Sequence, residues 1–246
     1  MRITESTVDV PLPASPHGVV RAAVVRPASG GPFPLVLCFA DIFGNTDAHL
    51  RVMRRFAGHG YVVASPEPWH HHLAPGTVLD FDKDRDRALA CQDIADPAAA
   101  DAAREALIAH FSSSTSAVCA LGFCYGGHLS FRAAAFSPAV KAAACFYGTG
   151  LHRDRLGNTE ATTLSRAADI KGEVLLVWGR DDPHIPADGR ARIHRALDGG
   201  DVRFETRLYD AEHAFARDIG PRYDPEATDL AFDATLALFA RATRPR

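Results

Sequence analysis

Short apolar runs alternate with longer stretches of helical spacing along most of this chain. The apolar, partly β-branched runs predict buried strands at Leu35–Ala40, Tyr61–Ser65, Ser116–Leu121, Val140–Tyr147, Glu173–Gly179 and Val202–Tyr209. The other stretches predict helices at Thr46–His59, Pro97–Phe111, Gly127–Phe136, Ala187–Leu197 and Glu226–Ala240. This alternation is typical of an α/β fold with a mostly parallel sheet and helices on both faces.

The N-terminal part of the chain departs from this alternation. Thr7–Val10 and Val19–Val25, joined by a turn with Pro and Gly, predict antiparallel strands at the sheet edge. The chain has 246 residues and neither a low-complexity linker nor a repeat, so we expect one domain over residues 1–246. The stretch between Tyr147 and Glu173 is too short for a separate lid domain, which needs ~50 residues or more.

Composition and charge restrict the partners, cofactors and cellular compartment that we expect for this protein. A net charge of −3 from well-mixed charges does not favour a nucleic-acid partner. No apolar run approaches the ~18 residues of a membrane span, so we expect a soluble, cytoplasmic protein without a membrane partner. Five cysteines, an odd number, fit a reducing compartment. With neither a dinucleotide fingerprint nor a credible metal set, we expect no cofactor, and a monomer or weak homo-oligomer that acts on a small molecule.

The segment Gly122-Phe123-Cys124-Tyr125-Gly126 carries the strongest chemical signal. It follows a predicted strand and precedes an alanine-rich helix, which is the nucleophile-elbow pattern with Cys in place of Ser. The helix start favours the thiolate, and the backbone N–H of Tyr125 would be one donor to an oxyanion. The elbow pattern does not surround the other cysteines, and we expect these to be inert: Cys38, Cys91, Cys119 and Cys145.

A nucleophile at an elbow needs an acid and then a histidine later in the chain. The loop after the strand Glu173–Gly179 offers Asp181 and Asp182 as the acid, and Asp181 could instead be a turn residue. His213 follows the predicted strand Val202–Tyr209 and is the candidate general base.

The remaining histidines offer weaker candidates. The run His70–His72 suggests a metal, but three consecutive positions do not converge on one ion in regular structure, so we favour a loop at the rim of the substrate site. His184 lies beside the proposed acid and could be mistaken for the base, but it precedes any strand that would carry it to the nucleophile. We expect the others to be solvated, namely His17, His49, His59, His110, His128, His152 and His194.

Four segments together resemble the dienelactone hydrolases (carboxymethylenebutenolidases), which have the α/β-hydrolase fold, and the likeness covers nearly the whole chain. They are Asp41–Gly44, Gly122–Gly127, Gly179–Pro186 and His213–Arg217. The resemblance implies a triad of Cys124, His213 and Asp182, and the amide of Ile42 as the second oxyanion donor. It also implies that a carboxylate after the first parallel strand helps to ionise the thiol.

Asp41 occupies the place where the family usually has glutamate. Its shorter side chain reaches about 1.5 Å less far, enough to break a hydrogen bond. Asp41 therefore either activates Cys124 or only caps the helix that starts near Thr46.

The resemblance also implies that arginines hold a substrate carboxylate. One of these matches Arg217, which could alternatively form a surface pair with Asp218 or Asp210. The other falls in the segment with Arg85 and Arg87, of which we favour Arg87.

The sequence thus predicts hydrolysis of a dienelactone-like ester or lactone through an acyl-thioester on Cys124. One alternative is a thioesterase or promiscuous carboxylesterase, in which loss of Arg217 would not alter activity. The other is a non-catalytic binding or thiol redox-sensing protein, which would need neither Asp182 nor His213.

Overall fold

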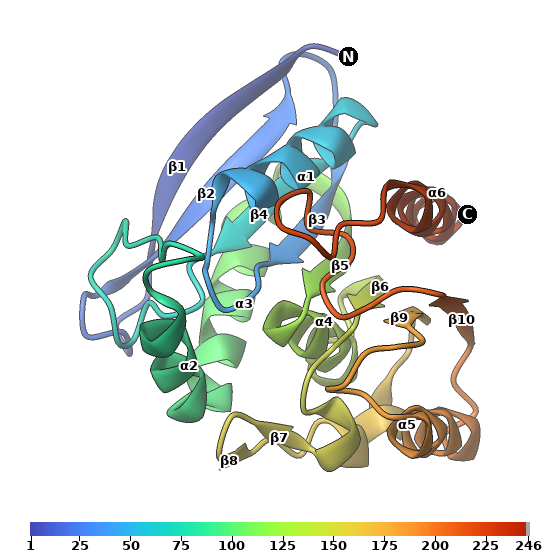
Figure 1. The fold of residues 1–246 in the computed structure, drawn as a ribbon. Coiled ribbons are helices and arrows are strands. Elements are labelled where there is room, and N and C mark those ends of the chain that lie inside the picture. Colours follow the sequence, from blue (N-terminus) through green and yellow to red (C-terminus); the bar gives the residue numbers. More distant parts are fainter. Residues whose placement is uncertain (245–246) are drawn as a thin grey trace.

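The computed structural model describes residues 1–244, and its centre is an eight-stranded sheet (Figure 1). The strand order is β1-β2-β4-β3-β5-β6-β9-β10. The strands are β1 (Ile3–Pro11), β2 (Val19–Pro27), β3 (Phe33–Phe39), β4 (Val62–Pro66), β5 (Thr115–Phe123), β6 (Val140–Phe146), β9 (Glu173–Gly179) and β10 (Phe204–Tyr209). All pairs from β4 to β10 are parallel, whereas β1 and β2 are antiparallel at one edge, as predicted.

Helices cover both faces of the sheet (Figure 1). They are α1 (Asp47–Gly58), α2 (Arg85–Asp93), α3 (Pro97–Phe111), α4 (Tyr125–Phe136), α5 (Ala187–Gly199) and α6 (Pro225–Ala242). The ring of Phe56 in α1 packs against Phe232 and Phe239 in α6, which joins these two helices on one face. On the other face α4 packs along β3, β5 and β6, with α3 beside it.

Every predicted strand and helix is present, and α3 and β9 have the predicted boundaries. The pattern missed α2, because its sequence is polar on all sides and buries only Ala88 and Cys91. It also missed short elements between β6 and β9. These are the 3-10 turns η1 (Leu151–Arg153) and η2 (Leu164–Asp169) and the hairpin of β7 (Arg155–Leu156) and β8 (Thr159–Glu160).

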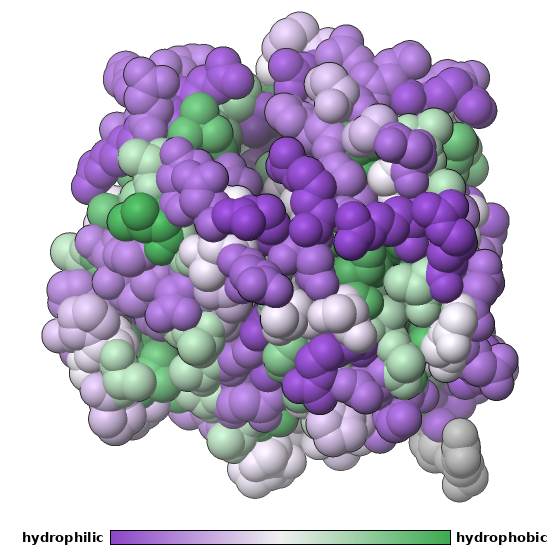
Figure 2. Space-filling view, turned by 90° about the horizontal axis from the view of Figure 1, so that it is seen from below, coloured by the Kyte–Doolittle hydropathy of each residue, from purple (hydrophilic) through white to green (hydrophobic). Residues whose placement is uncertain are grey.

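The surface is mainly hydrophilic on the face in Figure 2, where hydrophobic residues form small separate groups. That face therefore offers no single large apolar patch for a partner. Within residues 1–244, no helix is long and apolar enough to cross a membrane.

Two histidines that the sequence placed in solvent are in fact buried. His49 is 7% exposed, and its Nε2 lies 2.9 Å from the hydroxyl of Ser65. His128 has no exposed surface, and its Nδ1 lies 3.0 Å from the carbonyl oxygen of Thr149. The prediction was wrong for His128 because α4 lies against the middle of the sheet and buries every residue from Tyr125 to Ala135, so it has no polar face there.

Replacing His128 by glutamine is expected to weaken the acid sensitivity of the fold. Burial lowers the pKa of His128 to about 4 from 6.5. As pH falls from about 6.5 to 4, His128 becomes protonated in the unfolded chain while it stays neutral in the native state. The free energy of unfolding therefore declines over this range, by at most about 3 kcal/mol for this residue. Urea unfolding at several pH values should show a shallower loss of stability in His128→Gln across this window.

The matched control is His59→Gln, which changes an exposed histidine at the end of α1. It should keep the wild-type slope of unfolding free energy against pH. Equal slopes for wild type and His128→Gln would contradict the expectation.

Candidate active site

Cys124 joins β5 to α4 in a strained turn. Its φ is +56° and its ψ is −117°, a conformation that costs free energy for any residue with a Cβ. The amide of Cys124 donates to the carbonyl of Phe146 at 3.0 Å, which fixes the turn to the end of β6. A Cβ on Gly122 would lie 1.9 Å from the oxygen of Gly126, so only glycine fits at Gly122. This is the elbow that the sequence predicted.

The sulfur of Cys124 differs from the other thiols in its exposure. Cys124 is partly exposed, whereas Cys38, Cys91, Cys119 and Cys145 are buried. Burial raises the pKa of Cys119 and of Cys145 to about 12. Because the thiolate is the reactive species, these two buried groups are poorly suited to react, as the sequence indicated.

His213 and Asp182 form a buried hydrogen-bonded pair. His213 Nδ1 lies 2.7 Å from Asp182 Oδ2, and both side chains are almost fully buried. The neighbouring aspartate, Asp181, is exposed and makes no such contact. The other oxygen of Asp182 accepts the amide N–H of His184 at 2.8 Å, so the carboxylate is held from two sides. The geometry therefore joins His213 to Asp182 and leaves Asp181 outside.

Cys124 and Asp182 both act on the charge state of His213. Burial disfavours the charged imidazolium, but the negative charge of the Cys124 thiolate and hydrogen bonds to Asp182 and Cys124 outweigh it. Together they raise the pKa of His213 to about 10. The arrangement can hold a proton on His213. The ring of His184 packs edge-on against that of His213, with centroids 4.7 Å apart.

Asp41 contacts Arg217 rather than the helix that follows it. Its Oδ2 lies 3.4 Å from Arg217 Nη1, and its Oδ1 accepts the amide of Phe43 at 2.9 Å. Thr46 caps α1 instead, so the capping alternative for Asp41 was wrong. Burial raises the pKa of Asp41, although the Phe43 amide and Arg217 oppose this effect.

Arg217 is a largely buried cation with few partners. Its guanidinium lies over the ring of Phe81, 3.8 Å from the centroid, and its Nε has no hydrogen-bond partner within residues 1–244. The surface pairs considered for it do not form, because Asp218 pairs with Arg51 and Asp210 with Arg180.

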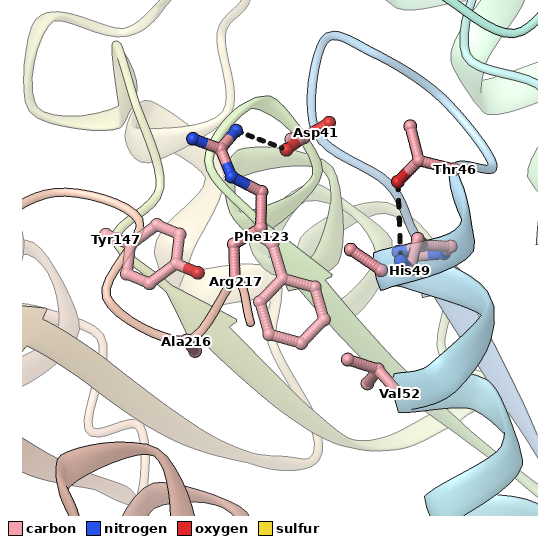
Figure 3. Close-up of a pocket in the computed structure, with 9 residues that line it drawn as sticks. Asp41, Thr46, His49, Val52, Phe123, Tyr147, Ala216 and Arg217 are labelled. Carbon is pink, nitrogen blue, oxygen red and sulfur yellow. Dashed lines mark hydrogen bonds and ion pairs between the residues drawn. The ribbon is translucent and has the colours of Figure 1, made fainter. Parts of the chain in front are cut away.

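A pocket lies between α1 and the loop after β10 (Figure 3). Its cavity volume is about 30 Å³, enough for one or two water molecules. Asp41 and Arg217 supply its charges, while Val52 and Phe123 supply apolar surface. Cys124 and His213 do not line this pocket, which adjoins the elbow through Phe123.

The two amides expected to bind an oxyanion are unoccupied donors. Within residues 1–244, the N–H of Ile42 and the N–H of Tyr125 donate to no protein acceptor. Tyr125 is the first residue of α4, where helix geometry leaves its N–H without a partner.

Sequence reasoning missed two aromatic residues around this site. Tyr147 follows β6 with φ +38°, its ring packs 5.1 Å from that of His213, and Figure 3 shows its hydroxyl directed toward Phe123 and Arg217. Trp69 follows β4 and hydrogen-bonds the loop that contains Ile42. Their positions at the carboxyl ends of strands were the available signal.

The other predicted residues do not join this group. Arg87 and Arg85 are exposed on α2, and within residues 1–244 no hydrogen bond or ion pair joins either of them to Cys124, His213 or Arg217. His70 and His71 lie in the loop after β4, where their rings pack together, and their ring nitrogens have no hydrogen-bond partner within residues 1–244. Within residues 1–244 no cluster of at least three His, Cys, Asp or Glu could hold a metal ion.

The sheet order, the helices on both faces and the elbow define an α/β hydrolase. The model of the dienelactone hydrolase family matches residues 20–243. The chain therefore belongs to the dienelactone hydrolase family, and it is a carboxylic ester hydrolase.

Individual relatives agree with this assignment. A Methylorubrum extorquens protein provisionally named carboxymethylenebutenolidase is 31% identical over 85% of this chain and 72% of its own. The carboxymethylenebutenolidase of Pseudomonas sp. strain P51 is 28% identical over 86% of each chain. A Klebsiella pneumoniae structure, provisionally described as a dienelactone hydrolase, superposes with a TM-score of 0.81 at 25% identity and covers 97% of this chain and 99% of its own.

Proposed function

We propose that this enzyme hydrolyses a small ester or lactone that carries a carboxylate, with Cys124 as the nucleophile. The observation that carries the proposal is the strained Cys124 at the start of α4, which raises the pKa of a His213 that Asp182 holds. A buried acid–histidine pair close to a partly exposed cysteine is the arrangement that nucleophilic catalysis needs.

The proposed reaction has two halves. The Cys124 thiolate adds to the carbonyl carbon, and the oxyanion accepts hydrogen bonds from the amides of Ile42 and Tyr125. The carbon–oxygen bond then breaks, the leaving oxygen takes the proton of His213, and an acyl-thioester remains; in a lactone the leaving oxygen stays attached to the acyl group. His213 next removes a proton from water, the hydroxide adds to the thioester, and the carbon–sulfur bond breaks to restore the thiolate.

Arg217 is the proposed anchor for the substrate carboxylate. Its charge is largely buried, its contact with Asp41 is long at 3.4 Å, and its Nε donates to no protein group within residues 1–244. A guanidinium with spare donors at a pocket wall is suited to grip a carboxylate with two hydrogen bonds. Arg87 remains a weaker prediction for a second anchor.

Binding of such a substrate would weaken the ion pair between Asp41 and Arg217. A carboxylate that pairs with Arg217 competes with Asp41 for the same guanidinium, and a released Asp41 could accept the thiol proton wherever His213 has not already taken it from Cys124. The shift of its pKa above the usual carboxyl value supports this role, because a more basic carboxylate accepts a proton more readily.

The test of the nucleophile is to trap the intermediate. The enzyme is mixed with a neutral aryl ester and quenched in acid within the first turnovers, and its peptides are weighed by mass spectrometry. One acyl group on the peptide that contains Cys124 supports the proposal. Continued hydrolysis with no acylated Cys124, in quenches faster than turnover, would contradict it.

Replacing Arg217 by methionine is expected to impair only the acidic substrate. The change removes the charge and keeps an apolar chain against Phe81. Loss of a charge-assisted double hydrogen bond should reduce kcat/KM for a dienelactone by roughly 10- to 100-fold. Steady-state rates should change less than about threefold for a neutral aryl ester.

Arg54→Met is the matched control, because Arg54 pairs with Glu5 on the exposed side of α1. It should leave both rates unchanged. If Arg217→Met also leaves both unchanged, the enzyme is a general carboxylesterase or thioesterase without an acid anchor. If wild type hydrolyses no ester, lactone or thioester, Cys124 serves binding or redox sensing instead.

A further inference from the structure

The loop that follows β3 uses nearly all of its backbone hydrogen-bonding groups. The carbonyl of Asp41 accepts the amide of Gly44 at 3.2 Å, and the carbonyl of Phe43 accepts the amide of Leu79 at 3.1 Å. The amide of Phe43 donates to Asp41 Oδ1, and the carbonyl of Ile42 accepts the indole N–H of Trp69 at 2.8 Å. From the Asp41 carbonyl to the Phe43 carbonyl, only the N–H of Ile42 lacks a partner among the residues that the structure describes.

One peptide group in this loop is therefore held at both ends. The peptide between Ile42 and Phe43 has its oxygen bound by Trp69 and its N–H bound by Asp41. It directly follows the peptide that carries the free N–H of Ile42. A fixed peptide on that side restricts rotation about the Ile42 backbone, so the free N–H keeps its direction.

Trp69 is itself held firmly. The side chain is 3% exposed, and its backbone carbonyl accepts the amides of His72 and Leu73, both at 2.8 Å. Its ring also packs on the ring of Tyr125, with centroids 4.8 Å apart. Trp69 thus contacts both residues whose amides are the proposed oxyanion donors.

We infer that Trp69 is a positioning residue, which aligns the Ile42 loop and Tyr125 so that their two N–H groups converge on the oxyanion. This inference rests on the proposed function. In this role the indole acts indirectly, through the hydrogen bond to Ile42 and the contact with Tyr125.

The test compares a reaction that forms an oxyanion with one that does not. Ester hydrolysis passes through a tetrahedral oxyanion, whereas alkylation of Cys124 by iodoacetamide displaces iodide from a saturated carbon. Trp69→Phe removes the indole N–H and retains an aromatic ring. Complete loss of an oxyanion donor costs 10²–10³ in kcat, so a misaligned donor should cost about 10-fold. We expect that loss in kcat, with KM and the alkylation rate within about twofold of wild type.

The matched control is Trp178→Phe, since Trp178 is 2% exposed in β9 and packs on His194 away from the Ile42 loop. It should keep the wild-type kcat. Trp69→His, whose ring can present an N–H, should recover part of the kcat lost in Trp69→Phe. If Trp69→Phe does not fold, Trp69→Tyr takes its place, because tyrosine has no donor at the position of the indole N–H. Its kcat for hydrolysis and its rate of alkylation by iodoacetamide are then compared with those of wild type.

A kcat for Trp69→Phe equal to that of wild type would overturn the inference. An equal loss of alkylation and hydrolysis would also overturn it, because the variant would then have disturbed the thiol and His213 rather than the oxyanion donors. A separate result would contradict the proposed function itself, namely a wild-type enzyme that hydrolyses the ester without forming acylated Cys124.

Discussion

Replacing Cys124 by alanine is expected to reduce ester hydrolysis by roughly 10³-fold or more. Alanine cannot form the acyl intermediate, so His213 could only direct water at the substrate in the remaining oxyanion site. The fold should persist, because the sulfur is partly exposed and the turn is fixed by backbone hydrogen bonds and close glycine contacts. Purified variant and wild type are compared by kcat and by thermal melting.

Cys91→Ala supplies the control for this experiment. Cys91 is buried in α2 and belongs to no part of the site, so its variant should retain wild-type kcat even where stability falls slightly. Substantial hydrolysis by Cys124→Ala, after removal of any contaminating wild-type enzyme, would argue that another group is the nucleophile.

Replacing Gly126 by alanine is expected to abolish the folded state or to destabilise it by about 4 kcal/mol or more. A Cβ at this position would lie 2.1 Å from the carbonyl oxygen of Phe39 and 2.5 Å from that of Ala40. Both contacts are with backbone at the end of β3, so no side chain can rotate away to relieve them. Helix α4 would have to move off the sheet and carry Cys124 with it.

Soluble yield and urea unfolding measure this effect, and Gly58→Ala gives the comparison. Gly58 lies in the last turn of α1, and a Cβ there would meet no heavy atom within 4 Å. The same substitution should therefore raise stability, by about 0.5–1 kcal/mol, through better helix propensity. A Gly126→Ala protein as stable as wild type would show that α4 does not approach β3 as closely as described.

The sequence predicted the framework well because its signals are local. Buried strands such as β9 are continuous apolar runs, and the elbow is a contiguous motif with its glycines in place. Cys124, Asp182 and His213 could be proposed together, because each follows a strand and the carboxyl ends of parallel strands meet at one edge. The resemblance to a family was needed to choose Asp182 over Asp181.

Features that depend on packing between distant segments were not predictable. The bond from Trp69 to Ile42 follows from the pairing of β3 with β4, which no local pattern specifies. The burial of His128 depends on both the sheet and the loop after β6 covering α4. The pairing of Asp41 with Arg217 joins residues from opposite ends of the chain and could not be separated beforehand from a helix cap.

The loops that carry the site follow β3, β5, β9 and β10, so its residues are drawn from almost the full length of the chain. Parallel strands pair only after long connections have closed, which makes such contacts late and slow to form during folding. Helices can form early from local sequence, but no fragment that ends before β10 contains His213. Under the proposed mechanism, catalytic competence is thus a property of the fully assembled sheet, and a nascent chain leaving the ribosome would not hydrolyse its substrate before β10 has docked.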